Sequence, residues 1–216
     1  NGTTILMRYT LRLLTTQQYE RAAAMICACD LIRKEHADLF GEKRISIGLW
    51  VGSTSTPNRM NGTQDNTAVK AYNNLYNGSS NKNPFVMLKC PWCGAQMGLV
   101  TLKDSRRELP GYKKIINGKS NKIIFQCNNS NHHCDFSNDG YDLPVHIVDD
   151  DIYETTPTLL IGTVDKFAML PYLPEAQSLF GFENGVKKIA PDLIIQDELH
   201  LISGPLGSMV GHYETM

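Results

Sequence analysis

The chain has 216 residues, 42% of them hydrophobic, which suits one ordinary domain or one domain with a large insertion. Its 21 basic and 22 acidic side chains nearly cancel, so net charge gives no sign of a nucleic-acid-binding surface, and such a surface would have to be local. No apolar run is long enough to span a membrane and no export signal is present, which predicts a cytoplasmic protein without a membrane partner.

The first elements in chain order alternate between strand and helix. Residues 4–10, TILMRYT, are a short apolar run that predicts a buried strand. A capping pattern at Thr15 and helically spaced apolar residues then predict a helix over about 16–35. Residues 45–51, ISIGLWV, predict a second strand. The chain starts without Met and stops within a pattern, so we expect it to be an internal piece of a larger protein.

The composition changes after residue 52. Asn, Gly, Ser and Thr dominate residues 53–83 and predict mainly loop, with a short helix over 67–76. Four cysteines follow with the spacing C-x2-C-x33-C-x6-C: Cys90, Cys93, Cys127 and Cys134. Close cysteine pairs in a chain without an export signal are typical of metal ligands rather than disulfides.

Four thiolates predict a closed, structural Zn²⁺ site, and either His132 or His133 could replace one of the last two cysteines. A redox-active C-x-x-C is the alternative, but it needs Cys90 at a helix N-terminus after a strand, whereas an Asn-rich loop precedes it. The other two cysteines, Cys27 and Cys29, lie in the predicted helix and are expected to pack in the core.

The segment between the cysteine pairs is locally basic. Residues 103–122 contain seven basic and two acidic side chains, which would suit either contact with nucleic acid or the solvated surface of a hairpin. Tyr112 and Phe125 could stack on bases or form a small core. The sequence leaves both alternatives open.

Regular elements return after residue 139. Strands are predicted at 145–148, 158–161 and 193–195, with a helix that begins at Val164 and stops at Pro171. The alternation of strands and helices predicts an α/β fold, a parallel sheet with flanking helices. In such sheets, ligands bind beyond the carboxyl ends of the strands.

Two adjacent acids, Asp197 and Glu198, follow the last predicted strand. At that position one carboxylate can hold Mg²⁺ through water while the other activates the water that attacks a γ-phosphate. His200, two residues further on, could sense the same phosphate or link to the partner lobe of a motor. The alternative interpretation is that these residues are solvated charge at the end of a strand.

Three motifs together resemble those of superfamily 2 helicases of the DExH type. D-E-L-H at 197–200 is similar to their motif II, M-R-Y-T at 7–10 to motif Ia and G-T-V-D-K at 162–166 to motif Ib, in the family's order. Longer segments at 8–18, 162–167 and 197–207 resemble more closely the helicases of the DISARM anti-phage defence system.

The resemblance implies how the chain is organised. A partial RecA-like helicase lobe, with a parallel sheet and flanking helices, would comprise residues 1–56 and 140–216. An Asn-rich loop and a zinc ribbon would be inserted at 57–139. The phosphate-binding loop G-x-x-x-x-G-K-[ST] occurs nowhere in the chain and would precede it.

The resemblance also implies a function, as part of an ATP-dependent helicase or translocase in anti-phage defence, with possible defence-complex subunits as partners. Asp197 would coordinate Mg²⁺ and Glu198 would act as general base. Side chains expected to contact the phosphodiester backbone of DNA, or of RNA, are Arg8, Thr10, Thr163 and Lys166. Each of these four could instead be a polar residue that ends a strand. Without a phosphate-binding loop, the chain alone is expected not to hydrolyse ATP at a useful rate.

Two other functions fit the same residues. The first is a non-catalytic, zinc-stabilised module that binds nucleic acid or serves as a scaffold. The second is a magnesium-dependent nuclease or phosphohydrolase, which would need further acids near Asp197. Asp149, Asp150 and Asp151 are the dense candidates, and they are expected in a loop.

Overall fold

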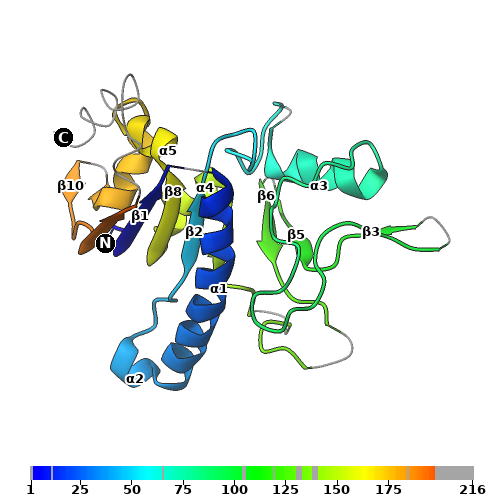
Figure 1. Cartoon of the computed structure of the whole chain (residues 1–216), viewed down its shortest axis with the longest axis horizontal. Coiled ribbons are helices and arrows are strands. Elements are labelled where there is room, and N and C mark those ends of the chain that lie inside the picture. Colours follow the sequence, from blue (N-terminus) through cyan, green and yellow to red (C-terminus); the bar gives the residue numbers. More distant parts are fainter. Residues whose placement is uncertain are drawn as a thin grey trace.

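A five-stranded parallel sheet forms the centre of the fold (Figure 1). The computed structural model describes residues 2–10, 12–64, 66–103, 106–118, 120–129, 133–137, 141–183 and 185–197. In spatial order the strands are β11 (Leu193–Gln196), β1 (Ile5–Tyr9), β8 (Leu159–Thr163), β2 (Ile47–Trp50) and β7 (Val145–His146). Every neighbouring pair is parallel, so the predicted α/β fold is confirmed.

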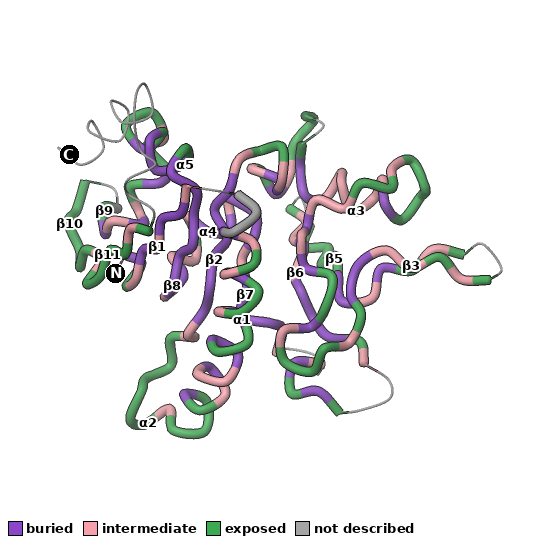
Figure 2. Tube along the Cα trace, viewed as in Figure 1, coloured by how far each residue is buried: buried purple, intermediate pink, exposed green. Residues whose placement is uncertain are grey.

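The inner strands are buried on both faces because helices cover the sheet on both sides. All residues of β2 and β8 are buried, whereas the edge strand β11 is largely exposed (Figure 2). Side chains alternate between the faces, as period-two geometry requires. Leu159 and Ile161 belong to one apolar core, while Leu160 belongs to the other.

The long helix α1 (Arg12–Glu35) supplies the first core and lies between the sheet and the inserted segment (Figure 1). Tyr19, Ala23 and Ile26 are its buried apolar residues in that core. The second core is covered by α4 (Asp149–Thr155), α5 (Val164–Ala168) and the 3₁₀ helices η1 (Leu170–Tyr172) and η2 (Pro174–Phe180). None of the described helices combines the length and the apolar composition that a membrane crossing requires.

The remaining elements are short. α2 (Ala37–Phe40) follows α1, and β9 (Phe182–Glu183) pairs with β10 (Val186–Lys187). The insertion, residues 57–139, contains α3 (Ala68–Asn77) and two antiparallel hairpins. These pair β3 (Val100–Thr101) with β4 (Arg107–Glu108), and β5 (Tyr112–Asn117) with β6 (Ser120–Phe125).

A buried carboxylate holds the end of α1 to the segments around it. Asp30 has no exposed surface and accepts hydrogen bonds from Arg33 Nε (2.9 Å), Arg44 Nε (2.9 Å) and the backbone N–H of Ile45 (3.0 Å). The hydroxyl of Tyr141, just after the insertion, donates a further bond of 3.0 Å. Although burial raises the pKa of Asp30, the bonds from Arg33 and Arg44 hold it below its usual value.

We therefore expect the substitution Asp30→Ala to destabilise the chain strongly. It leaves the buried guanidinium of Arg33 without its carboxylate, a loss worth about 3–5 kcal/mol in comparable pairs, while Arg44 keeps its ion pair with Asp142. Chemical denaturation of the chain measures the effect, with Asp38→Ala on the exposed surface of α2 as the control. A change below about 1 kcal/mol for Asp30→Ala would contradict this role.

A second carboxylate joins the insertion to the sheet. Asp151, at the start of α4, contacts His146 Nδ1 on β7 and Lys122 Nζ on β6, each at 2.6 Å. Burial alone would raise the pKa of Asp151, but His146 and Lys122 lower it to about 2. The ionised form is therefore favoured in the folded state.

Stability should consequently depend on Asp151 in acid. Because its pKa is about 2 in the folded chain and 3.8 in a free side chain, its contribution is complete above pH 4 and is lost as the pH falls towards 2. The shift corresponds to about 2 kcal/mol. Denaturation measured at pH 6, 4 and 2.5 should show a steeper loss for the unmodified chain than for Asp151→Asn, and parallel curves would contradict it.

Candidate functional site

The ends of three adjacent parallel strands bring the predicted motifs to one edge of the sheet, here called the carboxyl rim. Arg8 of β1 is in register with Gln196 of β11 on one side and with Gly162 of β8 on the other. Asp197 follows Gln196, Thr163 follows Gly162, and Thr10 follows Arg8 after one intervening residue, Tyr9. They therefore emerge at the same end of three neighbouring strands (Figure 1).

Asp197 is the exposed acid of the carboxyl rim. Its backbone N–H donates to the carbonyl oxygen of Arg8 at 3.0 Å, which extends the pairing of β1 and β11 by one residue. Burial, and secondarily the charge of Asp197, raises the pKa of the neighbouring Tyr9 phenol. Glu198 and His200 lie outside the described residues, so the structure locates the first acid of the pair only.

The four predicted backbone contacts differ in exposure. Arg8 is 2% exposed, Thr163 is 3% exposed and Lys166 is 7% exposed, whereas Thr10 is partly exposed. All four lie at or next to the carboxyl rim. Of the four, Thr10 is the side chain that a phosphodiester could reach in this conformation.

Lys166 is held in a buried ion pair. Its ammonium contacts the carboxylate of Asp149, and the amide oxygen of Asn58 is 3.5 Å away. The ring of Trp50 lies 5.8 Å from the same nitrogen. Burial raises the pKa of Asp149 to about 6, and Lys166 opposes that rise. Contact between Lys166 and nucleic acid stays a prediction, and it requires this ion pair to open.

The three consecutive acids begin α4 and do not form a loop, so that expectation was wrong. Asp149 contacts Lys166, Asp151 contacts His146, and Asp150 accepts the backbone N–H of Met60 at 2.8 Å. The helix dipole favours acids in the first turn. A run of three Asp residues is more typical of a loop, which is why the sequence did not indicate the helix. Because each carboxylate already has a protein partner, a cluster converging with Asp197 on a metal is not favoured.

Gly162 has a steric role in the G-T-V-D-K segment. A Cβ at this position would lie 2.9 Å from the ring of Phe167 and 3.0 Å from the carbonyl oxygen of Trp50. Any larger residue would therefore push β8 away from α5 or β2. The glycine allows the close packing that sets where Thr163 leaves the sheet.

The four cysteines of the insertion come together as predicted. The sulfur atoms of Cys90, Cys93, Cys127 and Cys134, here called the cysteine quartet, all lie within 4.8 Å of one another. In a tetrahedral zinc–thiolate site, sulfur atoms are about 3.8 Å apart, so this donor set can hold a zinc ion. His133 is exposed and is not part of the cluster, while His132 lies outside the described residues.

The thiols of the quartet have unequal acidities. Partial burial raises the pKa of Cys93, but hydrogen bonds from the backbone of Ala95 and from nearby side chains lower it to about 7. Burial raises the pKa of Cys134 to about 12 and also raises those of Cys90 and Cys127. A bound divalent cation would favour the thiolates, so metal binding would release protons.

The first cysteine pair lies in a turn and not at a helix N-terminus, which disfavours redox chemistry. Gly94 has a φ of 74°, and its N–H donates to the carbonyl oxygen of Cys90 at 2.9 Å. The indole N–H of Trp92 donates to Asp135, beside Cys134, at 2.8 Å. The first bond closes the turn around Cys90 and Cys93, and the second joins the two halves of the quartet.

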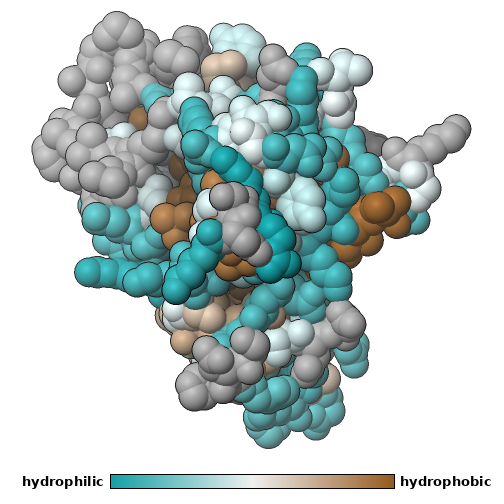
Figure 3. Space-filling view, turned by 90° about the vertical axis from the view of Figure 1, so that its right-hand side faces the viewer, coloured by the Kyte–Doolittle hydropathy of each residue, from teal (hydrophilic) through white to brown (hydrophobic). Residues whose placement is uncertain are grey.

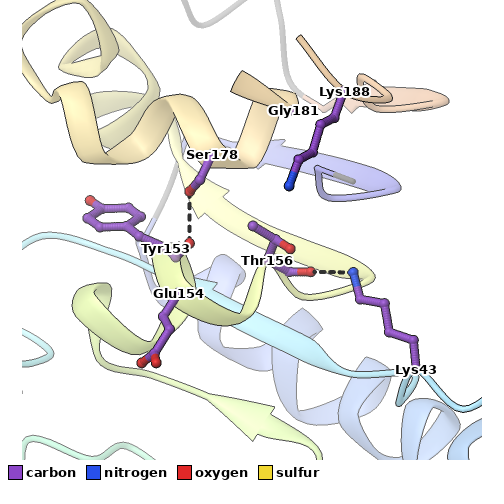
Figure 4. Close-up of a pocket in the computed structure, with 7 residues that line it drawn as sticks. All are labelled: Lys43, Tyr153, Glu154, Thr156, Ser178, Gly181 and Lys188. Atoms are coloured by element: carbon purple, nitrogen blue, oxygen red, sulfur yellow. Dashed lines mark hydrogen bonds between the residues drawn. The ribbon is translucent and has the colours of Figure 1, made fainter. Parts of the chain in front are cut away.

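A small cavity of about 220 Å³ lies away from the carboxyl rim (Figure 4). Its lining includes Lys43, Thr156 and Lys188, and the ammonium of Lys43 donates to the carbonyl oxygen of Thr156 at 3.4 Å. Lys43 precedes β2 and Thr156 precedes β8, so the cavity lies at the amino ends of the strands. It is therefore distinct from the predicted nucleotide site.

Comparison with known proteins gives one relationship over the whole chain. No protein-family model matches it. The DISARM protein DrmA of Bacillus paralicheniformis is 36% identical over 253 residues, an alignment that takes in 100% of this chain and 20% of that protein. The identity supports a DrmA-like relationship. The chain spans about a fifth of the length of this curated relative.

The quartet makes a direct prediction for metal content. Purified chain should contain about one zinc per molecule, and the double substitution Cys90→Ser with Cys93→Ser should remove it, because two of four ligands are lost. Elemental analysis measures the metal. Cys29→Ser, on α1 and outside the quartet, is the matched control and should keep it. Equal metal content in both variants would contradict the assignment.

Proposed function

On the premise of a DrmA-like relationship, we propose that this chain is part of an ATP-dependent nucleic-acid helicase or translocase that acts in anti-phage defence. Its contribution would be the DELH motif and the neighbouring loops of one RecA-like lobe. Asp197 would hold Mg²⁺ through water, Glu198 would activate the attacking water, and His200 would respond to the γ-phosphate. When bound, Mg²⁺ would neutralise charge on the phosphates of ATP.

The common rim of Thr10, Thr163 and Asp197 is the observation that carries this proposal. A motor that couples nucleotide hydrolysis to movement needs its phosphate chemistry and its nucleic-acid contacts on connected loops. The register of β1, β8 and β11 provides that connection, because the three loops leave adjacent strands at one end. The order of the motifs along the chain agrees with the resemblance to DExH helicases.

The domain organisation is part of the same proposal. Residues 1–56 and 140–216 would form the partial RecA-like lobe, and residues 57–139 the insertion. A structural zinc ion in the quartet would stabilise an insertion that has few regular elements of its own. DNA is the expected polymer, with RNA as the alternative, and further subunits of a defence complex are possible partners.

A non-catalytic binding or scaffold module is the second candidate. The burial of Arg8, Thr163 and Lys166 favours it, because these side chains then support the fold instead of contacting a ligand. The two functions predict opposite behaviour of Asp197, since a scaffold does not need an exposed acid at the carboxyl rim.

We predict that Asp197→Asn in the full-length protein lowers nucleic-acid-stimulated ATP hydrolysis on the order of 100-fold, because an outer ligand of Mg²⁺ is lost. Initial rates with ATP, Mg²⁺ and single-stranded DNA measure the effect. Asp192→Asn, an exposed acid at the other end of the same strand, is the matched control and should retain activity. The 216-residue chain alone should show no useful turnover.

Equal rates for Asp197→Asn and the unmodified protein would favour the scaffold. So would a full-length protein without ATPase activity. Turnover by the isolated chain close to that of the full-length protein would contradict the assignment of phosphate binding to residues outside it. The thermal transition of each variant should match that of the unmodified protein, so that lost activity is not lost folding.

A further inference from the structure

The insertion carries a solvent-accessible groove of about 600 Å³ that shares only Cys127 with the predicted metal site. One wall is Tyr72 of α3, and another is the β5–β6 hairpin with Lys113 and Lys114. The floor continues into Cys127 and Asn128, where the second half of the quartet begins. Its volume lies in the range of ligand-binding sites in proteins.

The lining of the groove favours an anionic ligand. It contains two lysines and three side-chain amides, and there is no carboxylate among the described residues that line it. The ammonium of Lys114 donates to the amide oxygen of Asn73 at 3.0 Å, which fixes its position without neutralising its charge. The end of the molecule that carries the insertion is mainly hydrophilic at its surface (Figure 3).

Two tyrosines of α3 form a stacked pair beside this charge. The rings of Tyr72 and Tyr76 have centroids 6.5 Å apart and planes inclined by 4°. They are four residues apart on the helix, which places them on the same face. Tyr76 is 56% exposed and therefore presents an aromatic surface next to the groove that Tyr72 lines.

The other candidate aromatic residues are unsuitable for stacking. Tyr112 and Phe125 are buried and pack edge-on against each other and against Phe85. Of the two roles left open by the sequence, base stacking and a small core, they therefore have the second. The hydroxyl of Tyr112 also donates to the carbonyl oxygen of Met87 at 2.6 Å. Of the two tyrosines that line the groove, Tyr72 of α3 is therefore the one available for stacking.

The quartet and the groove adjoin at the segment that begins with Cys127. Cys127 belongs both to the quartet and to the lining, and the amide of Asn129 lies 3.7 Å from the sulfur of Cys93. A metal ion held by the four thiolates would thus fix Asn128 and Asn129 relative to the lysines. The groove and the metal site therefore share residues of one segment.

We propose that this groove binds single-stranded nucleic acid, with phosphates at the lysines and bases stacked on Tyr72 and Tyr76. Stacking on tyrosine needs bases with an open face, which a single strand offers and a duplex does not. Phosphate contacts at Lys114 position the strand without reading its sequence. The proposal extends the proposed function by adding a second contact on the strand, and it does not require ATP hydrolysis.

The test measures binding of a fluorescent oligo-dT to the full-length protein without ATP, over a range of salt concentrations. Tyr76→Ala should weaken binding about 5-fold or more through lost stacking, with the salt slope unchanged. Lys114→Ala should weaken binding and reduce the slope of log K against log salt by about 0.7. Matched controls are Tyr172→Ala and Lys187→Ala, both exposed and outside the insertion, which should bind as the unmodified protein does.

A second measurement locates the strand directly. Ultraviolet cross-linking of oligo-dT that contains 4-thiothymidine should label a peptide of α3 or of the β5–β6 hairpin. Labels confined to residues outside 57–139, or unchanged binding by both groove variants, would overturn the proposal. The proposal would also be overturned if polyglutamate of matched charge displaced the labelled oligo-dT as well as unlabelled oligo-dT does. The same holds if duplex DNA bound more tightly than oligo-dT and the groove variants abolished that preference.

These outcomes are separate from those of the Asp197 test. Asp197→Asn should bind oligo-dT as the unmodified protein does, because the groove is on a different element. Unchanged zinc content and thermal transition in the groove variants establish that they fold. If the motor proposal is wrong, oligo-dT should still cross-link to α3. If the groove does not bind the strand, the full-length protein should still hydrolyse ATP at its basal rate.

Discussion

The parallel register of β1 with its two neighbours is the constraint on which the candidate site depends. Side chains alternate between the two faces of a strand. A register shift of one residue would therefore turn Leu6 out of the second core towards α1 and bring its neighbours into that core. Both faces of β1 and β8 are covered, which makes such a slip costly. The register therefore fixes Arg8 beside Gln196 and Gly162, and with it the position of Asp197.

The insertion shares its interior with the sheet. Cys27 of α1 is buried in the same core as Cys90, Cys127 and Cys134, and burial together with the nearby Cys90 raises the pKa of its thiol. Asp151 adds a charged link across the same boundary, through Lys122 of β6. α1 thus has the sheet on one side and the insertion on the other. A change at the metal site would therefore alter the packing of α1, the helix that covers the sheet.

The strands of the sheet were predicted from the sequence more successfully than the contacts of the polar side chains at the carboxyl rim. Apolar runs are local signals, so strands at 5–9, 47–50, 159–163 and 193–196 could be expected from their own residues. The cysteine spacing similarly predicted a cluster that the fold then closed. The sequence suggested a hairpin surface around 103–122 but not the bounds of its strands, because β5 (YKKIIN) and β6 (SNKIIF) each have two adjacent Ile residues instead of an alternating apolar pattern.

Long-range pairing explains what sequence patterns could not supply. From the sequence, Lys166 was interpreted as a polar residue after a strand. Its ion-pair partner Asp149 lies 17 residues earlier, in a run of acids without an apolar pattern, so no local signal indicated the pair. Only the pairing of β2 with both β7 and β8 brings α4 and α5 close enough for that ion pair. The stacking of Tyr72 on Tyr76 is different, since a four-residue spacing on a predicted helix is visible in the sequence.

The Asp149–Lys166 pair also limits how the carboxyl rim can engage a phosphodiester. An ammonium that is already neutralised and buried offers little attraction to a phosphate, and separating it from Asp149 leaves a carboxylate with no counter-charge in a desolvated site. Because burial already raises the pKa of Asp149 to about 6, uptake of a proton would ease that separation. Lys166 can therefore serve a nucleic-acid strand only if α4 and α5 move apart or Asp149 is neutralised. In the groove, Lys114 instead donates to the uncharged amide of Asn73, so contact with a phosphate there separates no such ion pair.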